Sequence, residues 1–304
     1  MSSQTPSHKP VRRVIAIVAA AVALMGFSFY VGRVSAPEDQ APRPLPAVQP
    51  LKAGPGSPSN PALKKFVDNP TASQLSYLRL SDGMRIGTAT ERYARPALSL
   101  IKLYIAEYVI EHGTEEEKFE ALAMVSNSSD SSAEALFEKY PDSIDDVAKR
   151  YGLHSTRSDE RWGYSVTSTY DVVNFIAQLK EKNPTHPILV AMSRADSVAA
   201  DGYRQNFGTA KLQNVIGSKF GWSDDFDLHS SVSFGENFVV AAAVNGSADD
   251  LTSFVKTQIT GEKLREASLY HVNRSRAQRG LPPLEGDRDA AATTSRRSGD
   301  SKQD

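Results

Sequence analysis

The 304-residue sequence contains no cysteine, and this absence removes several kinds of chemistry together. Disulfide scaffolds, thiol catalysis, iron–sulfur clusters and cysteine-based zinc sites all require cysteine side chains. The six histidines are scattered along the chain, without an H-E-x-x-H motif or a comparable ligand spacing. We therefore expect neither a metal ion nor a cofactor in this protein.

An excess of charge of one sign is also lacking, because 35 lysines and arginines stand against 36 acidic residues. Nucleic-acid-binding proteins need a basic excess or a basic stripe, so we expect no nucleic-acid partner. The G-x-S-x-G, P-loop and G-x-G-x-x-G motifs are absent as well. Their absence argues against an α/β hydrolase, an NTPase and a dinucleotide-dependent enzyme.

One long apolar run is present, from Val14 to Val31, and a short basic cluster precedes it. This pattern predicts a cytoplasmic N-terminus over residues 1–13, a transmembrane anchor over 14–32 and an extracellular remainder. Small residues at 34–36 resemble a cleavage site, which leaves a cleaved signal peptide and secretion as the alternative. The length of the run, and Pro37 directly after that site, favour a retained anchor.

Composition divides the rest of the chain into three parts. Residues 33–60 are dense in proline, glycine and serine, which predicts a semi-extended linker. Residues 274–304 contain almost no large apolar side chains, which predicts a disordered tail. The part between them, residues 61–273, is long enough to bury a substantial core as one domain.

Hydrophobic periodicity and turn signals predict strands towards both ends of this domain and helices between them. The predicted strands are Ser76–Leu80, Arg85–Ala89, Asn214–Phe220, Asp227–Phe234 and Phe238–Asn245. The predicted helices are Pro61–Val67, Leu98–His112, Glu115–Met124, Ser131–Tyr140, Ser143–Tyr151, Thr167–Lys182 and Leu251–Val272. The fold class is therefore α+β, with one antiparallel sheet built from both chain ends and a helical block inserted into it.

Ser99 and Lys102 lie one helical turn apart at the start of the most apolar of these helices. A lysine among apolar neighbours loses its proton more readily, because burial disfavours the charged amine. Such an amine can act as the base that makes a nearby serine nucleophilic. The alternative is structural, with Ser99 beginning the helix and Lys102 reaching solvent or an ion-pair partner.

The S-x-x-K spacing of Ser99 and Lys102 resembles the first motif of the penicillin-recognising serine hydrolases, which are the serine β-lactamases and D,D-peptidases. The second motif of that family, S-x-N, is approximated from Ser128 to Asp130. A register shifted by one residue selects Ser129 and Ser131 instead.

The third motif of the family, K-T-G on a strand facing the nucleophile, is approximated by Lys219, Phe220 and Gly221. The order of the motifs and the elements around them agree with the family over nearly all of residues 61–273. The resemblance implies a β-lactamase-like fold for this domain.

The resemblance also implies roles for the motif residues. Lys102 would take the proton of Ser99, which attacks a carbonyl, and backbone N–H groups including that of Ser99 would stabilise the oxyanion. Ser128 and Lys219 would pass a proton to the leaving amine. The substrate-binding positions would be Asp130, Phe220 and Gly221. Structural alternatives remain for two of these residues, with Ser128 as a helix cap and Lys219 as an exposed strand residue.

The sequence departs from the family pattern at three places. Phe220 replaces a hydroxyl residue that helps to hold the substrate carboxylate in the family, and Asp130 brings a carboxylate to a site built for an anionic acyl donor. The loop Ser155–Ser165 lacks a counterpart of the deacylating glutamate of β-lactamases. This last departure argues against efficient β-lactamase activity.

These observations predict an exported, membrane-anchored serine hydrolase of the penicillin-binding type. Its substrate would be a peptidoglycan peptide, or a related amide or ester, and the reaction would pass through an acyl-serine. The alternative is a catalytically degenerate module of the same fold that binds or scaffolds at the cell envelope. The sequence leaves the oligomeric state open.

Overall fold

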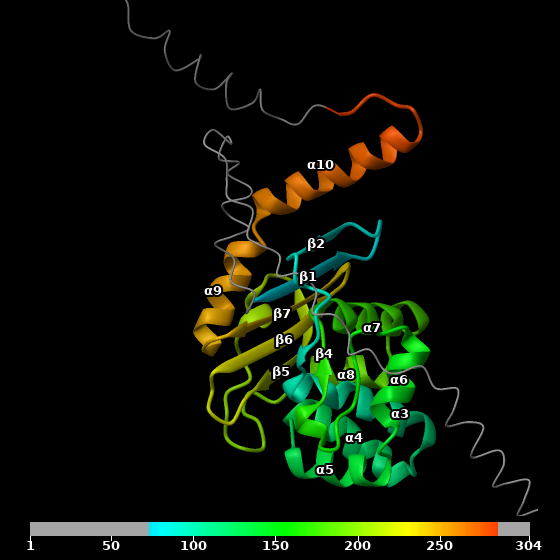
Figure 1. The fold of residues 1–304 in the computed structure, drawn as a ribbon, viewed down its shortest axis with the longest axis vertical. Coiled ribbons are helices and arrows are strands. Elements are labelled where there is room, and N and C mark those ends of the chain that lie inside the picture. The colour runs from blue at the N-terminus through cyan, green and yellow to red at the C-terminus, as the bar shows by residue number, and fades with distance from the viewer. Residues whose placement is uncertain (1–72, 285–304) are drawn as a thin grey trace, which may run out of the picture. The chain divides into compact units, whose positions relative to one another are not determined.

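Segments from the two ends of the domain form one antiparallel sheet in the computed structural model, which describes residues 73–284 (Figure 1). Its strands are β1 Gln74–Arg79, β2 Arg85–Gly87, β5 Val215–Trp222, β6 Leu228–Gly235 and β7 Phe238–Asn245. They lie in the order β2-β1-β7-β6-β5, so the N-terminal hairpin pairs with the C-terminal strands. The α+β class, with a sheet assembled from both chain ends, is confirmed.

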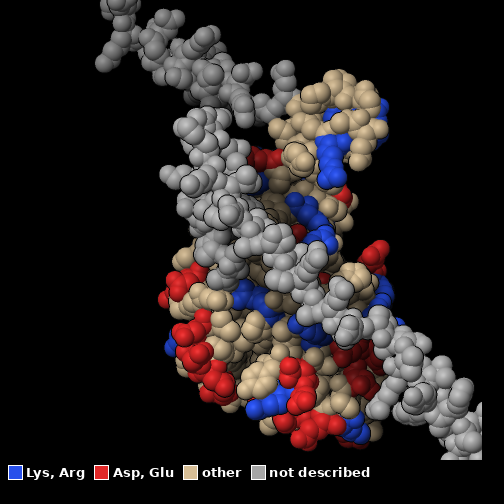
Figure 2. Space-filling model, viewed as in Figure 1, with Lys and Arg blue, Asp and Glu red and all other residues tan. Residues whose placement is uncertain are grey.

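A helical block is inserted between β2 and β5 and covers one face of the sheet (Figure 1). Its helices are α3 Lys102–His112, α4 Glu115–Asn127, α5 Asp130–Lys139, α6 Ser143–Tyr151, α7 Thr169–Lys182 and α8 Pro187–Ser193. On the face shown in Figure 2, acidic side chains gather around α5 and the loops beside β5 and β6.

Strand β7 lies at the centre of the sheet because its apolar run is covered on both faces. It pairs with β1 on one side and with β6 on the other. Val239 and Ala241 pack under the helical block, whereas Val240, Ala242 and Val244 pack in a second cluster on the opposite face. Burial on both faces explains why this strand reads as a continuous hydrophobic run without alternation.

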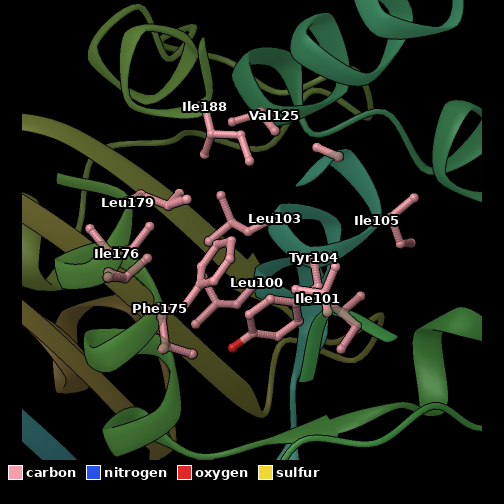
Figure 3. Packing of buried hydrophobic residues seen from close by; sticks show 14 of the residues in the cluster. Leu100, Ile101, Leu103, Tyr104, Ile105, Val125, Phe175, Ile176, Leu179 and Ile188 are labelled. Atoms are coloured by element: carbon pink, nitrogen blue, oxygen red, sulfur yellow. The ribbon is translucent and has the colours of Figure 1, made fainter. Parts of the chain in front are cut away.

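Helix α3 is the central helix of the inserted block, and its first residues are enclosed on every side. Leu103, Tyr104 and Ile105 have no solvent exposure. The ring of Tyr104 meets that of Phe175 of α7 edge-on, with ring centroids 5.0 Å apart. Figure 3 shows Leu103 on the side of the turn that faces Leu179, with Ile105 on the opposite side. The N-terminal end of α3 is therefore held rigidly beside the sheet.

The C-terminal end of the domain differs from the predicted single helix over Leu251–Val272. Two helices occur there, α9 Ala248–Gln258 and α10 Gly261–Gln278. The hydroxyl of Thr260 accepts the N–H of Lys263 and so begins a new helix at this point. Helix α10 also continues past residue 273, into the region where the composition predicted disorder.

Two further elements were not predicted in their observed form. The expected helix over Leu98–His112 begins as a separate 3₁₀ turn, η1 Leu98–Ile101, before α3. Helix α8 was missed altogether, although Pro187 at its first turn and the capping ring of His186 are recognisable start signals. The turn η1 contains Ser99, whereas α8 packs against α4 and β5.

The predicted cytoplasmic residues 1–13, the transmembrane anchor over 14–32, the linker over 33–60 and the helix Pro61–Val67 lie outside the described residues. Most of the predicted tail, from residue 285 onwards, also lies outside them. Within residues 73–284, no helix combines the length and apolar character needed to cross a membrane.

Candidate functional site

Ser99 lies in η1, where the inserted helical block meets strand β5. A Cβ atom placed on Gly221 of β5 would lie 2.9 Å from the backbone nitrogen of Ser99 and 2.8 Å from the Cβ of Leu98. Only a glycine allows the two backbones to approach this closely. Leu98 has a φ of +54°, a left-handed conformation that costs free energy for a leucine. The residue before Ser99 is thus held in a strained turn against the sheet.

The side chain of Lys102 points back along the first turn to Ser99. Its Nζ donates to the Ser99 Oγ at 2.9 Å and to the carbonyl oxygen of Ser128 at 2.6 Å. It also contacts the carboxylate of Asp130. Lys102 has no solvent exposure, and Ser99 is 7% exposed. The structural alternative of a lysine reaching solvent is therefore wrong.

Ser128 and Lys219 meet on the other side of this site. Lys219 Nζ donates to the Ser128 Oγ at 2.7 Å and lies 3.5 Å from the carbonyl oxygen of Met124 at the end of α4. Lys219 is fully buried, so it is not an exposed strand residue. Among the described residues, the Ser128 hydroxyl has no hydrogen bond to Ser99; it is the Ser128 carbonyl that joins Lys102.

The backbone between α4 and α5 decides which serine faces the site. Ser128 adopts a left-handed φ of 61°, which ends α4 and turns its hydroxyl towards Lys219. Ser129 begins α5 instead, because its Oγ accepts the N–H of Ser132 at 3.1 Å. The register that selects Ser128 therefore matches the geometry, and the capping role falls to Ser129.

Burial controls the charge of both lysines. It lowers the pKa of the Lys102 amine below its ordinary value, and the carboxylates of Asp130 and Asp201 oppose part of this shift. Burial, followed by the nearby charge of Lys102, holds the pKa of Lys219 well below its ordinary value. Desolvation favours the neutral amines, which are the forms that can accept a proton.

The backbone N–H groups of Ser99 and Trp222 lie at the edge of the sheet, where η1 meets β5. The N–H of Ser223 donates to the Leu228 carbonyl at 3.1 Å, and Trp222 lies opposite His229 in the same register. Hydrogen-bonded and non-bonded pairs alternate between antiparallel strands, so the N–H of Trp222 points away from β6. The N–H of Ser99 belongs to a first helical turn, where N–H groups lack partners inside the helix. This pair of donors is suited to an oxyanion.

The loop Ser155–Ser165 reaches Lys102 through an aromatic ring. Lys102 Nζ lies 4.8 Å from the ring centroid of Trp162, whose indole N–H donates to Glu134 at 2.7 Å. Asp171 anchors the start of the loop by accepting the N–H of Ser155 at 2.7 Å. The loop thus places the Trp162 indole beside Lys102. The family resemblance implies a deacylating glutamate in this loop instead.

Phe220 lies apart from Ser99, because neighbouring residues of a strand point to opposite faces of the sheet. Its side chain is 2% exposed and packs edge-on against Phe207, with ring centroids 5.0 Å apart. Of the three positions that the resemblance assigned to substrate binding, Asp130 and Gly221 border Ser99. Phe220 contributes to the second apolar cluster.

Three side chains near the site were not assigned a role from the sequence: Trp162, Asp201 and Trp222. Asp201 accepts the indole N–H of Trp222 at 3.0 Å and the backbone N–H of Tyr203 at 2.9 Å. Both tryptophans of the chain therefore lie next to the site, and their rarity is the one signal in the sequence that could have drawn attention to them.

Comparisons with known proteins bear on the fold. No protein-family model matches the sequence, and no curated protein matches it significantly. Among solved structures, a halotolerant bacterial β-lactamase superposes with a TM-score of 0.53 at 12% identity, covering 70% of this chain and 100% of that one. A β-lactamase from Burkholderia vietnamiensis has a TM-score of 0.51 at 12% identity, covering 66% and 97%.

A variant of an ancestral class A β-lactamase of Gram-negative bacteria has a TM-score of 0.52 at 14% identity, covering 69% of this chain and 97% of that one. Identities this low establish a shared fold, and the activity has to be argued from the site itself. The order of the three motifs and the superposition of nearly whole β-lactamase chains agree: the described domain has the fold of the serine β-lactamases.

Proposed function

We propose that the protein is a serine hydrolase that forms an acyl-enzyme at Ser99. The observation that carries this proposal is the buried pairing of two serines with two lysines. Lys102 contacts the Ser99 hydroxyl at 2.9 Å, and Lys219 contacts the Ser128 hydroxyl at 2.7 Å. Nucleophile and base within hydrogen-bond reach, with the base oriented by further partners, is the arrangement that nucleophilic catalysis requires.

The chemistry follows from these contacts. Neutral Lys102 takes the proton of Ser99 as the hydroxyl oxygen attacks a carbonyl carbon, and the N–H groups of Ser99 and Trp222 hold the developing oxyanion. Ser128, hydrogen-bonded to Lys219, supplies a proton to the leaving amine or alkoxide, and the proton that Lys102 took from Ser99 then restores the Ser128 hydroxyl. The indole of Trp162 faces Lys102, so we expect the acyl-enzyme to hydrolyse slowly and efficient β-lactamase activity to be absent.

The proposed setting is the cell envelope. The apolar run over residues 14–32 supports an anchored, exported domain, and the resemblance of the three motifs supports a peptidoglycan peptide or a related amide or ester as substrate. Proteolysis of intact cells that display the chain would test this placement. Digestion of the domain from outside supports it, and complete protection contradicts it.

The full-length protein should acquire a covalent adduct when incubated with a fluorescent penicillin, and Ser99→Ala should acquire none. Intact-protein mass spectrometry measures the adduct, and a general serine-reactive fluorophosphonate provides a second probe. Labelling by the fluorophosphonate alone would show an activated serine in a site that rejects penicillin. If neither probe labels the folded protein, the acyl-enzyme proposal is wrong.

Asp130→Asn should move the acid limb of the acylation rate to lower pH. The Asp130 carboxylate raises the pKa of Lys102, against the larger lowering by burial. Removing that charge lets the pKa of Lys102 fall further, so a larger fraction of the amine is neutral at any pH near 7. The second-order rate of fluorophosphonate labelling, measured against pH, reports the shift; an acid limb that moves to higher pH contradicts this account.

A binding module of the same fold is the second candidate, and one observation favours it. Asp130 contacts Lys102 directly and stabilises its protonated form, which cannot accept the proton of Ser99. A site locked in that state would bind an acyl compound without reacting. Saturable binding of a penicillin without any adduct would support this candidate over the hydrolase.

A further inference from the structure

The part of the site that a ligand meets is acidic, although the site contains two lysines. Lys102 and Lys219 have no solvent exposure, so a ligand cannot contact them from solvent in the way it contacts surface charges. The side chain of Asp130, in contrast, is 65% exposed. One of its oxygens contacts Lys102, and the other has no hydrogen-bond partner among residues 73–284.

Asp130 lies directly beside the reacting group. Its carboxylate and the Ser99 hydroxyl contact the same nitrogen atom, the Nζ of Lys102. A carbonyl carbon within reach of Ser99 therefore lies close to the Asp130 carboxylate, which the substituents beside that carbon can approach. A carboxylate only accepts hydrogen bonds when ionised, so it selects a donor, and a cation most strongly.

Asp201 brings a second carboxylate to the same area. The Ala200 N–H donates to the Asn127 carbonyl at 2.8 Å, which places Asp201 beside the turn at Ser128. The carboxylate is fixed by the indole of Trp222 at 3.0 Å and by the N–H of Tyr203 at 2.9 Å. Asp201 is exposed, and its charge acts on Lys102. One exposed carboxylate thus contacts Lys102, and a second, held beside the turn at Ser128, adds its negative charge to the same area.

A buried hydroxyl near Ser99 is also left without a partner. Ser230 is 2% exposed, and its Oγ has no hydrogen-bond partner among the described residues. A Cβ atom placed on Gly221 would lie 2.8 Å from this oxygen and 2.9 Å from the backbone nitrogen of Ser99. A buried polar group without a partner costs free energy unless a ligand or water satisfies it. Ser230 is therefore a buried polar group, close to the Ser99 backbone, that a ligand or a water molecule would satisfy.

We propose that the acyl donor of this site carries an ammonium group on the acyl side of the bond attacked by Ser99, recognised by Asp130 and assisted by Asp201. The proposal rests on the proposed function and deepens it. It names amides and esters with a free amino group as the substrate class, in place of anionic acyl donors. Phe220 offers no hydroxyl to a substrate carboxylate, since its side chain packs in the second apolar cluster, away from Ser99.

The ion pair between a substrate ammonium and Asp130 would also link substrate binding to loss of the proton from Lys102, the base. An ammonium next to Asp130 takes over part of the interaction that holds the proton on Lys102, and it adds a repulsive positive charge. The charged groups facing Lys102 are Asp130, Asp201 and Lys219. Of these, Asp130 is the one in direct contact with Lys102, so it is the one through which a substrate cation acts.

Ampicillin and benzylpenicillin form a matched pair of probes, since they differ in one amino group on the acyl side chain. Binding is measured by calorimetry with full-length Ser99→Ala protein, which cannot be acylated, at about pH 6, where an α-amino group is protonated. We expect ampicillin to bind about fivefold more tightly, the range of a solvent-exposed ion pair. The preference should disappear when Asp130→Asn is added and weaken when Asp201→Asn is added.

Glu138→Gln is the control, because it removes the same charge about 12 Å further along α5 and should leave the preference unchanged. Equal binding of the two penicillins, or a preference that survives Asp130→Asn, overturns the inference even if Ser99 is acylated. An intact preference in a protein whose Ser99 never reacts supports the inference and removes the proposed hydrolase.

Discussion

Lys102→Met should lower the rate at which Ser99 is acylated by about a thousandfold, while the protein stays folded. A positioned general base contributes roughly 10²–10⁴-fold to such a step. Methionine keeps the length of the buried stem and removes only the amine that contacts the Ser99 Oγ at 2.9 Å. The second-order rate of labelling by a fluorophosphonate, with circular dichroism as the check on folding, measures this loss.

Lys180→Met is the matched control for this experiment. Lys180 of α7 also has a pKa lowered by burial, and its Nζ lies 4.9 Å from the ring centroid of Phe234, away from Ser99. Its replacement should leave the labelling rate within about threefold of the parent. A folded Lys102→Met protein that labels at the parental rate would show that Lys102 is not the base.

Gly221→Ala should reduce acylation by about a hundredfold, the effect of losing one oxyanion donor. The added Cβ would lie 2.8 Å from the Leu98 Cβ and 2.9 Å from the Ser99 nitrogen, so β5 and η1 must separate. That separation moves the N–H of Ser99 away from the N–H of Trp222. The same labelling rate reports the loss, and binding of a non-reacting penicillin by the corresponding Ser99→Ala double variant should change less.

Two other glycines separate this effect from general damage. A Cβ on Gly217, in the same strand, would lie 2.8 Å from the backbone nitrogen of Ser193, so Gly217→Ala disturbs β5 without touching η1. A Cβ on Gly163, next to Trp162, would have no neighbouring atom within 4 Å, so Gly163→Ala should be neutral. If Gly217→Ala lowers the labelling rate as much as Gly221→Ala, the oxyanion interpretation fails.

The sheet and the first helices were predictable because their signals are local. The apolar run of β7 and the turn after β1 are each formed by consecutive residues. Strand β7 has the predicted bounds, and β1 begins two residues before the predicted start at Ser76. The pairing of Ser99 with Lys102 was also predictable, since residues three apart face each other on one turn. The contact between Ser128 and Lys219 joins residues 91 positions apart, and the family resemblance anticipated it where spacing alone could not.

The remaining features depend on backbone conformations and distant loops that leave no periodic signal. Whether Ser128 or Ser129 faces the site is decided by a left-handed φ at Ser128, which few residues other than glycine adopt. Trp162 lies over Lys102, and the charge of Asp201 acts on Lys102, from loops whose paths are set by tertiary contacts. The strained φ of Leu98 is imposed by the approach of β5, so nothing in the neighbouring residues indicates it.

The pairing of β1 with β7 joins the two ends of the domain, and it affects the order in which the helices and the sheet form during folding. Ser99, Lys102 and Ser128 belong to the inserted helices, whose contacts are mostly local, whereas Lys219 belongs to β5. Helices with local contacts form quickly, but a sheet that joins the two chain ends has to close a long loop first. We therefore expect closure of the sheet to be the slow step of folding. A chain in which β5 has not yet joined the sheet holds the serine and its base without the edge strand that completes the site, so we expect reactivity to appear only when folding is finished.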